Sequence, residues 1–290
     1  MDTAVVSTGI SLQNILFATD FSSCSDVALS YATGLCQRYG STLYTVHVVR
    51  EELSDGQPPI PFLLLHSAEE KMESLVAADP FRGVKHRELL REGGVAQVLS
   101  DVIEGLEIDL LVLGTHGRGG FKKLLLGSVA EEIVGFASCP VLTVGPHVSG
   151  LGAATNLKRI LCATDLQHGS AKSLAFAVHL AEREHAHITL VHVVKPLTDA
   201  PIEYLEAATE DAKKRIVQLI PAEATVEADC VVEVGMPAER IARVASEQKA
   251  DLIVMGAHHG SARMSAHLPW TTPHQVLSHA GCPVVTVREE

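Results

Sequence analysis

NILFATDFS, residues 14–22, returns as RILCATDLQ at residues 159–167, and this duplicated stretch decides the fold. In both copies a short apolar run of strand-forming residues ends in Ala-Thr-Asp. TVHVV at 45–49 likewise returns as LVHVV at 190–194, and both repeats are separated by 145 positions. Self-similarity at one fixed offset indicates that the chain consists of two copies of one domain.

Two further matches extend the repeat to the end of each half. IDLLVLGTHG at 108–117 corresponds to ADLIVMGAHHG at 250–260, and CPVLTV at 139–144 corresponds to CPVVTV at 282–287. PHVSGLGAAT lies between the halves and has small residues, Gly and Pro without apolar periodicity, which is typical of a flexible joint. The predicted organisation is a first domain at 1–146, a linker at 147–156 and a second domain at 157–290.

Within each copy, apolar strand-like runs alternate with helical patterns. In the first copy, strands are expected at 15–20, 41–49, 86–94, 109–114 and 139–144, and helices at 22–40, 95–109 and from 127 onward. The stretch 53–80 is longer and less regular. Strand and helix in alternation predict a parallel sheet with right-handed crossovers. The expected fold class is α/β: two tandem doubly wound domains, each a five-stranded parallel sheet in the order 3-2-1-4-5 with helices on both faces.

Composition limits the function classes. The chain has 290 residues, 47% of them hydrophobic, and a formal net charge of −12, which argues against a nucleic-acid or anionic-membrane surface. Its six cysteines form neither a CxxC pair nor a zinc-ribbon spacing, so reduced and mostly buried thiols are expected. No basic leader precedes a long apolar core and no segment approaches the length of a membrane span, so the expected compartment is the cytoplasm.

GTHGRGGFKKLLLGS, residues 114–128, contains the features of an anion-binding loop. Glycines let the backbone approach a ligand, and the helix that begins near Ser128 adds a partial positive charge. A Walker loop is excluded because Gly120 and Phe121 stand where Lys and Ser/Thr are needed. A dinucleotide fingerprint is excluded because Lys122 takes the place of the third glycine.

The spacing that does fit is G-x2-G-x9-G-S, formed by Gly114, Gly117, Gly127 and Ser128. Together with ATDFS, VHVV and CPVLTV it makes the chain resemble the universal stress protein family over nearly the whole of both halves. ATP-binding members of that family carry this spacing after the fourth strand and an aspartate at the end of the first. The resemblance implies a tandem universal stress protein that binds ATP, together with Mg²⁺, as a nucleotide-dependent regulatory module of the stress response.

The resemblance also assigns site residues in the first domain. Ala18, Thr19 and Asp20 would face the adenine and ribose, and Val48 would border the base. The remaining residues implied to line the ribose and phosphates are Leu113, Gly114, Thr115, Gly117, Gly127, Ser128, Val129 and Ala130. Arg118, Lys122 and Lys123 could contact phosphate or simply be solvated, and both readings stay open.

The second copy departs from this pattern. Gly256 and Asp165 remain, but His259 replaces the second glycine, and Trp270 stands where Gly127 should be. A Trp there would fill the groove, so the second domain is predicted to bind no ATP. His258, His259, His267, His274 and His279 cluster in the same region without a recognised metal spacing, and are interpreted as surface or hydrogen-bonded residues rather than metal ligands. His47 and His192 are interpreted as hydrogen-bonded core histidines.

The sequence offers a phosphate cradle but no motif that activates a water, so no catalytic residue is expected and binding is favoured over turnover. The alternatives are a slow ATPase or self-phosphorylating enzyme, with Ser128 as the modified residue in the family, and a scaffold that binds no nucleotide. Relatives resembling electron-transfer flavoproteins are a remoter option. Beyond ATP, the expected partner is an unidentified regulatory protein. The fifth strands, 139–144 and 282–287, are edge candidates that could pair within one chain as a pseudo-dimer, which could itself be a monomer or a homodimer.

Overall fold

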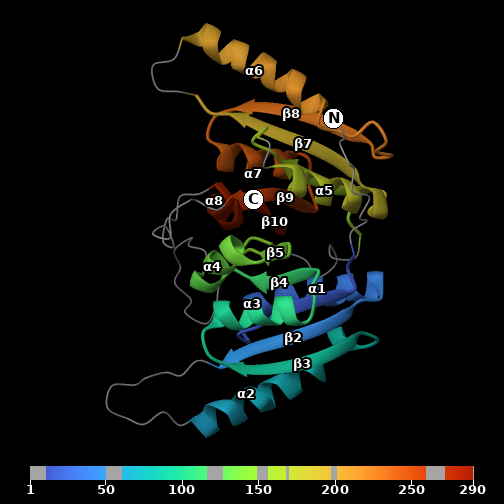
Figure 1. Ribbon diagram of the computed structural model, residues 1–290, viewed down its shortest axis with the longest axis vertical. Coiled ribbons are helices and arrows are strands. Elements are labelled where there is room, and N and C mark those ends of the chain that lie inside the picture. Colours follow the sequence, from blue (N-terminus) through green and yellow to red (C-terminus); the bar gives the residue numbers. More distant parts are fainter. Residues whose placement is uncertain are drawn as a thin grey trace, which may run out of the picture.

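The two halves share one sheet of ten strands in the computed structural model, which runs the length of the molecule in Figure 1. The structure describes residues 11–49, 61–115, 127–148, 156–167, 170–196, 201–258 and 272–289.

The first domain alternates strands and helices, as predicted. Its elements are β1 (Asn14–Ala18), α1 (Ser23–Tyr39), β2 (Thr42–Val49), α2 (Pro61–Val76), the 3₁₀ turn η1 (Asp79–Phe81), β3 (Lys85–Glu92), α3 (Val95–Gly105), β4 (Leu110–Gly114), α4 (Ser128–Phe136) and β5 (Val141–Val144). Helix α1 begins where the Ser22 hydroxyl accepts from the Ser25 amide, and it ends at Gly40, whose φ of 70° is left-handed. The helix expected at 22–40 is therefore present and ends at a left-handed glycine.

The second domain repeats the pattern. Its elements are β6 (Arg159–Ala163), α5 (Ala171–Glu184), β7 (His187–Val194), α6 (Ile202–Val217), β8 (Ala228–Val234), α7 (Pro237–Glu247), β9 (Leu252–His258), α8 (Thr272–His279) and β10 (Val284–Glu289). The sheet order is β3-β2-β1-β4-β5-β10-β9-β6-β7-β8, so each half has the predicted 3-2-1-4-5 order, with all its strands parallel.

The halves meet at an antiparallel ladder between β5 and β10. Leu142 lies opposite Val285, and on either side of this pair Thr143 faces Val284 and Val141 faces Thr286. The hydroxyl of Thr143 donates to the Val284 carbonyl over 3.0 Å, and that of Thr286 donates to the Val141 carbonyl over 3.4 Å. Thr143 and Thr286 are counterparts in the two copies, and so are the carbonyls that they bond, so the two halves are related as if by a two-fold axis.

Helices cover both faces of the sheet. On one face, α1, α2, α5 and α6 pack over a single core that contains buried residues of both domains, including Ile15, Phe17, Ile160 and Ile188. On the other face, α3 and α4 cover a core of the first domain, and α7 and α8 cover a core of the second. Val148, inside the expected linker, and Leu157, directly after it, are buried in the shared core.

The stretch 53–80, described from the sequence only as less regular, contains α2 at 61–76 and the start of η1, which spans 79–81. Pro61 occupies the first helical position, where proline is tolerated because its missing amide would be unpaired anyway. The helix then has good helix formers, and Ala68 and Met72 are buried. The prolines near the start of this segment obscured a regular helix.

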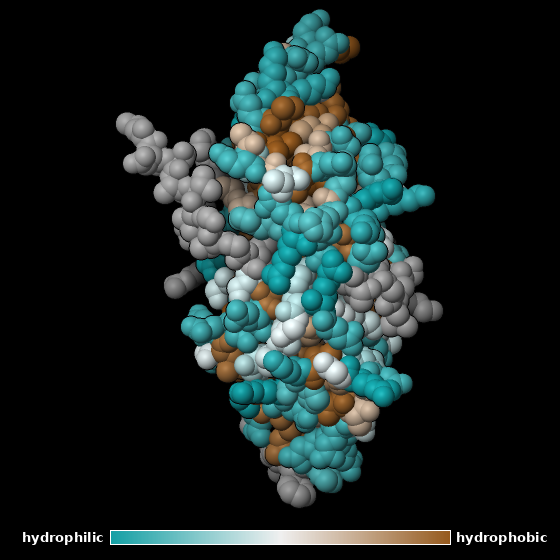
Figure 2. Space-filling model, turned by 90° about the vertical axis from the view of Figure 1, so that its right-hand side faces the viewer, coloured by the Kyte–Doolittle hydropathy of each residue, from teal (hydrophilic) through white to brown (hydrophobic). Residues whose placement is uncertain are grey.

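The surface is mostly polar on the face that Figure 2 shows, with hydrophobic residues in separate groups. Three of the exposed large apolar side chains, Ile202, Tyr204 and Val217, lie on α6. All six cysteines are free, and Cys36, Cys139 and Cys162 are buried. Among the described residues, none of the helices is long and apolar enough to cross a membrane.

Candidate functional site

Two of the predicted site residues, Thr19 and Asp20, form a hydrogen-bonded turn at the end of β1. The Thr19 amide donates to the Val46 carbonyl over 3.0 Å, and the Thr19 hydroxyl accepts from the Phe21 amide over 2.9 Å. One oxygen of Asp20 accepts from the Ser22 amide over 3.0 Å and from the Ser25 hydroxyl over 2.7 Å. These bonds fix the half-buried Asp20 carboxylate at the carboxyl edge of the sheet.

Phe21 completes this turn in an uncommon conformation. Its φ is 59°, a left-handed value that is costly for a bulky side chain. Its ring packs against the His47 ring, with the centroids 4.4 Å apart and the ring planes tilted by 41°. Nδ1 of His47 donates to the Thr19 carbonyl over 2.7 Å, which confirms that His47 is a hydrogen-bonded histidine. Val48 follows on β2 and is half-buried.

The end of β4 lies beside this turn. Ala18 on β1 is paired with Leu113 on β4, so the residues that follow each of them reach the same edge. Leu113 and Thr115 are buried. A Cβ on Gly114 would stand 3.0 Å from the backbone carbon and oxygen of Cys24, so a side chain there would require the Cys24 backbone to shift.

Helix α4 starts at the same edge. The Gly127 amide donates to the Thr115 carbonyl over 2.7 Å and brings the helix start against the end of β4. Gly127 has no side chain that could cap the helix, and the amides of Ser128, Val129 and Ala130 belong to the first turn, where amides lack intrahelical acceptors. Those three amides, rather than that of Gly127, are therefore the available anion donors. Gly117 lies outside the described residues.

The second domain reproduces the strand-end turn. The Thr164 hydroxyl accepts from the Leu166 amide, Asp165 accepts from the Gln167 amide and the Ser170 hydroxyl, and Leu166 has a φ of 60°. Nδ1 of His192 donates to the Thr164 carbonyl over 2.9 Å, so His192 is also hydrogen-bonded, as predicted.

The rest of the second site differs from the first. Trp270, His259 and His267 lie outside the described residues, but Pro273 lies in the first turn of α8, where it removes one amide. Glu289, only 3% exposed, accepts from the Ser173 amide over 2.8 Å and from the Lys172 amide over 3.2 Å. A Cβ on Gly256 would stand 3.0 Å from Cγ of Glu289. The chain thus places its own carboxylate beside Gly256.

Sequence reasoning missed Glu289, although a signal was present. Side chains alternate along a strand, so Val285, Val287 and Glu289 point to one face of β10. The two valines belong to the core beneath α5, which makes an acidic residue in the same row unexpected unless it is hydrogen-bonded.

The histidine-rich segment shows no metal centre in the part of the chain that is described: no group of three or more His, Cys, Asp or Glu residues could hold an ion there. Nδ1 of His279 donates to the Gln275 carbonyl over 2.7 Å. Nε2 of His274 lies 3.5 Å from an oxygen of Glu131 on α4. Burial lowers the pKa of His274, and the Glu131 carboxylate opposes that effect.

Comparison with known proteins finds the same family in both halves of the chain. The model of the universal stress protein family matches the chain twice, at residues 11–145 and 156–288. The chain belongs to the universal stress protein family.

Relatives of this universal stress protein include both single and tandem forms. It is 33% identical over 139 residues to a universal stress protein of Methanocaldococcus jannaschii, a match that covers 46% of this chain and 81% of the relative. It is 24% identical over 292 residues to a universal stress protein of Mycobacterium bovis, covering 95% of this chain and 97% of the relative. A crystal structure of a universal stress protein from Archaeoglobus fulgidus superposes with a TM-score of 0.75 at 20% identity and covers 97% of this chain and 98% of that one. The tandem α/β architecture is therefore shared.

Proposed function

We propose that the first domain binds one ATP, together with Mg²⁺, and that the chain acts as a nucleotide-dependent regulatory module in the stress response. The observation that carries this proposal is the bond from the Gly127 amide to the Thr115 carbonyl. It joins a helix start to the strand end beside which Asp20 lies. The proposed sugar and base site at Asp20 thereby lies next to the proposed phosphate site at the start of α4.

The chemistry of the donors fits the ligand. A carboxylate such as that of Asp20 accepts from ribose hydroxyls or a base amino group, and first-turn amides of α4 donate to phosphate oxygens. Mg²⁺ would be held chiefly by the phosphates, as is usual for this ion. The overall charge of −12 makes such a local group of donors necessary, because the protein as a whole repels anions.

The second domain is proposed not to bind ATP. Pro273 removes a donor from the start of α8, and Trp270 has the sequence position of Gly127. Glu289 adds a buried negative charge beside Gly256. Cytoplasmic location and an intramolecular pseudo-dimer across β5 and β10 complete the proposal.

Matched substitutions in the two copies test the assignment. Asp20→Asn and Asp165→Asn both keep an oxygen that can accept the turn bonds but lose the negative charge. By isothermal titration with Mg-ATP, we expect one site per chain in the wild type, at least tenfold weaker binding in Asp20→Asn, and unchanged binding in Asp165→Asn. Two sites per chain, or equal losses in both variants, would contradict the assignment to the first domain.

Turnover is measured on the same samples. The regulatory reading expects no sustained phosphate release under saturating Mg-ATP. Phosphate release that continues over many turnovers and disappears in Gly127→Trp would instead support the slow ATPase. Wild-type protein that carries no nucleotide and gives no heat with ATP would support the scaffold.

A further inference from the structure

Helix α4 of the first domain is contacted along its length by the second domain. Aligning Cys139-Pro140 with Cys282-Pro283 places counterpart positions 143 residues apart in this region, which makes His274 the counterpart of Glu131. These two residues face each other across the domain boundary, with His274 Nε2 3.5 Å from Glu131 Oε1 and with side chains only 15% and 20% exposed.

A histidine can face a glutamate at this position only because the two copies differ in sequence. Around a strict two-fold axis, a residue at this position would face itself, and two buried carboxylates would repel each other. The tandem chain instead sets an imidazole against a carboxylate. The contact joins the first turn of α4, which supplies the candidate phosphate donors, to the first turn of α8.

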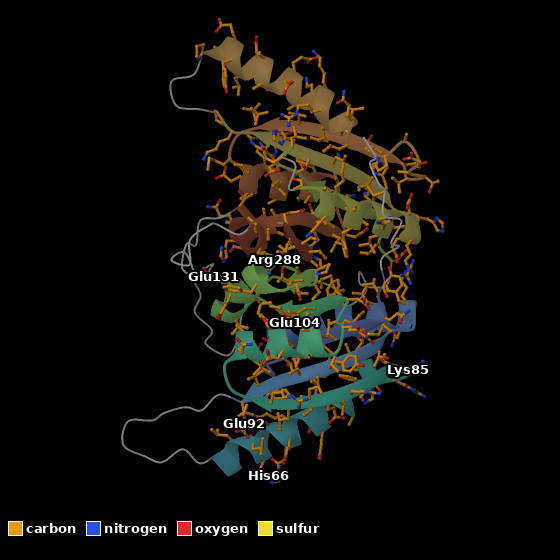
Figure 3. The ribbon with its side chains drawn as sticks, viewed as in Figure 1. His66, Lys85, Glu92, Glu104, Glu131 and Arg288 are labelled. Carbon is orange, nitrogen blue, oxygen red and sulfur yellow. The ribbon has the colours of Figure 1, made fainter. Side chains whose placement is uncertain are left out.

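The other end of α4 has a second contact. Nη1 of Arg288 on β10 donates to the carbonyl of Phe136, the last residue of α4, over 3.2 Å. A cation is favourable there because the carboxyl end of a helix carries partial negative charge. Figure 3 labels Arg288 and Glu131, which both lie where α4 meets the second domain. The counterpart of Arg288 is Gly145, which has no side chain and so offers α8 no equivalent cation. A Cβ at this position would stand 3.0 Å from the Leu277 carbonyl oxygen on α8.

Between its two ends α4 is held by packing. Val134 packs against the core of the first domain and also against that of the second. Because α4 has only nine residues, it depends on tertiary contacts for its stability and its orientation.

We propose that the second domain positions α4 for phosphate binding by the first domain, with His274 and Arg288 as the positioning residues. This inference rests on the proposed function, because it concerns the phosphate half of the same site. It gives the second domain a role that does not require a ligand of its own. By linkage, phosphate binding at the start of α4 strengthens the contact between the domains by the same factor that the contact strengthens binding.

The first test measures affinity for ATP and for adenosine in His274→Ala and Arg288→Ala. Because α4 is the phosphate half and the β1 turn is the nucleoside half, we expect about fivefold to tenfold weaker ATP binding and adenosine binding unchanged within twofold. The matched controls are His279→Ala, an exposed histidine on the same helix as His274, and Arg91→Ala, an exposed arginine on β3 that donates to the carbonyl of its neighbour Leu90. Arg288→Lys keeps the cation and should recover part of the ATP affinity.

The second test needs no nucleotide. By hydrogen–deuterium exchange of the full chain, α4 amides in His274→Ala and Arg288→Ala should exchange at least fivefold faster than in the wild type, while α3 amides should not change. Unchanged exchange in α4, or an equal loss of ATP and adenosine binding, would overturn the positioning role. If wild-type protein binds no ATP but α4 is still loosened by the substitutions, the proposed function fails and the mechanical part of the inference stands.

Discussion

At the scale of single residues, two glycines of the first domain meet opposite surroundings. Gly114, at the end of β4, has the backbone of Cys24 within 3.0 Å of where a Cβ would stand. Gly135, inside α4, has nothing within 4 Å of that position. One glycine is required by close packing, whereas the other is only a weak helix former.

We expect Gly114→Ala to destabilise the protein by about 1–3 kcal/mol, because a backbone neighbour must shift to admit the methyl group. The shift would also disturb the strand end beside Asp20, so ATP binding should weaken. Gly135→Ala should stabilise by about 0.5–1 kcal/mol through helix propensity. Urea unfolding monitored by circular dichroism measures both effects, and a destabilised Gly135→Ala would show that α4 is packed more tightly there than the structure indicates.

Several site residues could be predicted from the sequence and others could not. Asp20 and Gly114 lie at strand ends that apolar runs define, so their places followed from the pattern and the family resemblance. The contact between Glu131 and His274 could not be predicted, because its two residues are far apart in sequence and meet only through the pairing of the domains. Nor could the bond from the Gly127 amide to Thr115, because backbone bonds in loops leave no pattern of residue types.

At the scale of elements, the carboxyl ends of α1 and α5 meet in a buried polar cluster. Glu184, whose side chain is fully buried, accepts from Nε of Arg38 over 2.8 Å and from the hydroxyl of Tyr39. The guanidinium of Arg183 lies 4.1 Å from the centre of the Tyr39 ring. Burial and the Glu184 carboxylate raise the pKa of Tyr39, so its hydroxyl stays protonated and can donate. Residues 38 and 39 have 183 and 184 as their counterparts, so this cluster also follows the two-fold relation.

We expect Glu184→Ala to lower the free energy of unfolding by about 2 kcal/mol. This is near the usual contribution of hydrogen bonds to a charged group, reduced because Arg38 is partly exposed. The control is Glu210→Ala, which breaks an exposed pair with Lys214 and should change stability by less than about 0.5 kcal/mol. Denaturant unfolding of both variants provides the comparison. Equal effects would show that the cluster does not hold the two helices together.

Elements differed in how well the sequence predicted them. Buried parallel strands consist of nearly uninterrupted apolar runs, which made β1, β2, β4 and β5 recognisable, whereas β3 is mostly exposed and polar. Helix α2 was missed because Pro58, Pro59 and Pro61 read as a loop, although the last of them starts the helix. Pairing of β5 with β10 was considered as an edge contact, and the structure contains that ladder.

At the scale of the whole molecule, the described domains are not independent bodies, because the core beneath α1 and α5 is continuous across both and the sheet has no break. We therefore expect a single cooperative thermal transition by scanning calorimetry, with the calorimetric and van't Hoff enthalpies equal within error. Glu184→Ala should lower the midpoint without splitting the peak. Two resolved transitions in the wild type would show that the domains unfold separately.

The ladder between β5 and β10 has a last consequence, which concerns concentration. Two separate subunits that pair along an edge strand dissociate on dilution, whereas strands on one chain meet at an effective concentration fixed by the connecting segment. The pairing of β5 with β10 therefore does not depend on the concentration of the protein. Under the proposed function, the site in the first domain responds to the amount of nucleotide in the cell without also reporting the amount of protein.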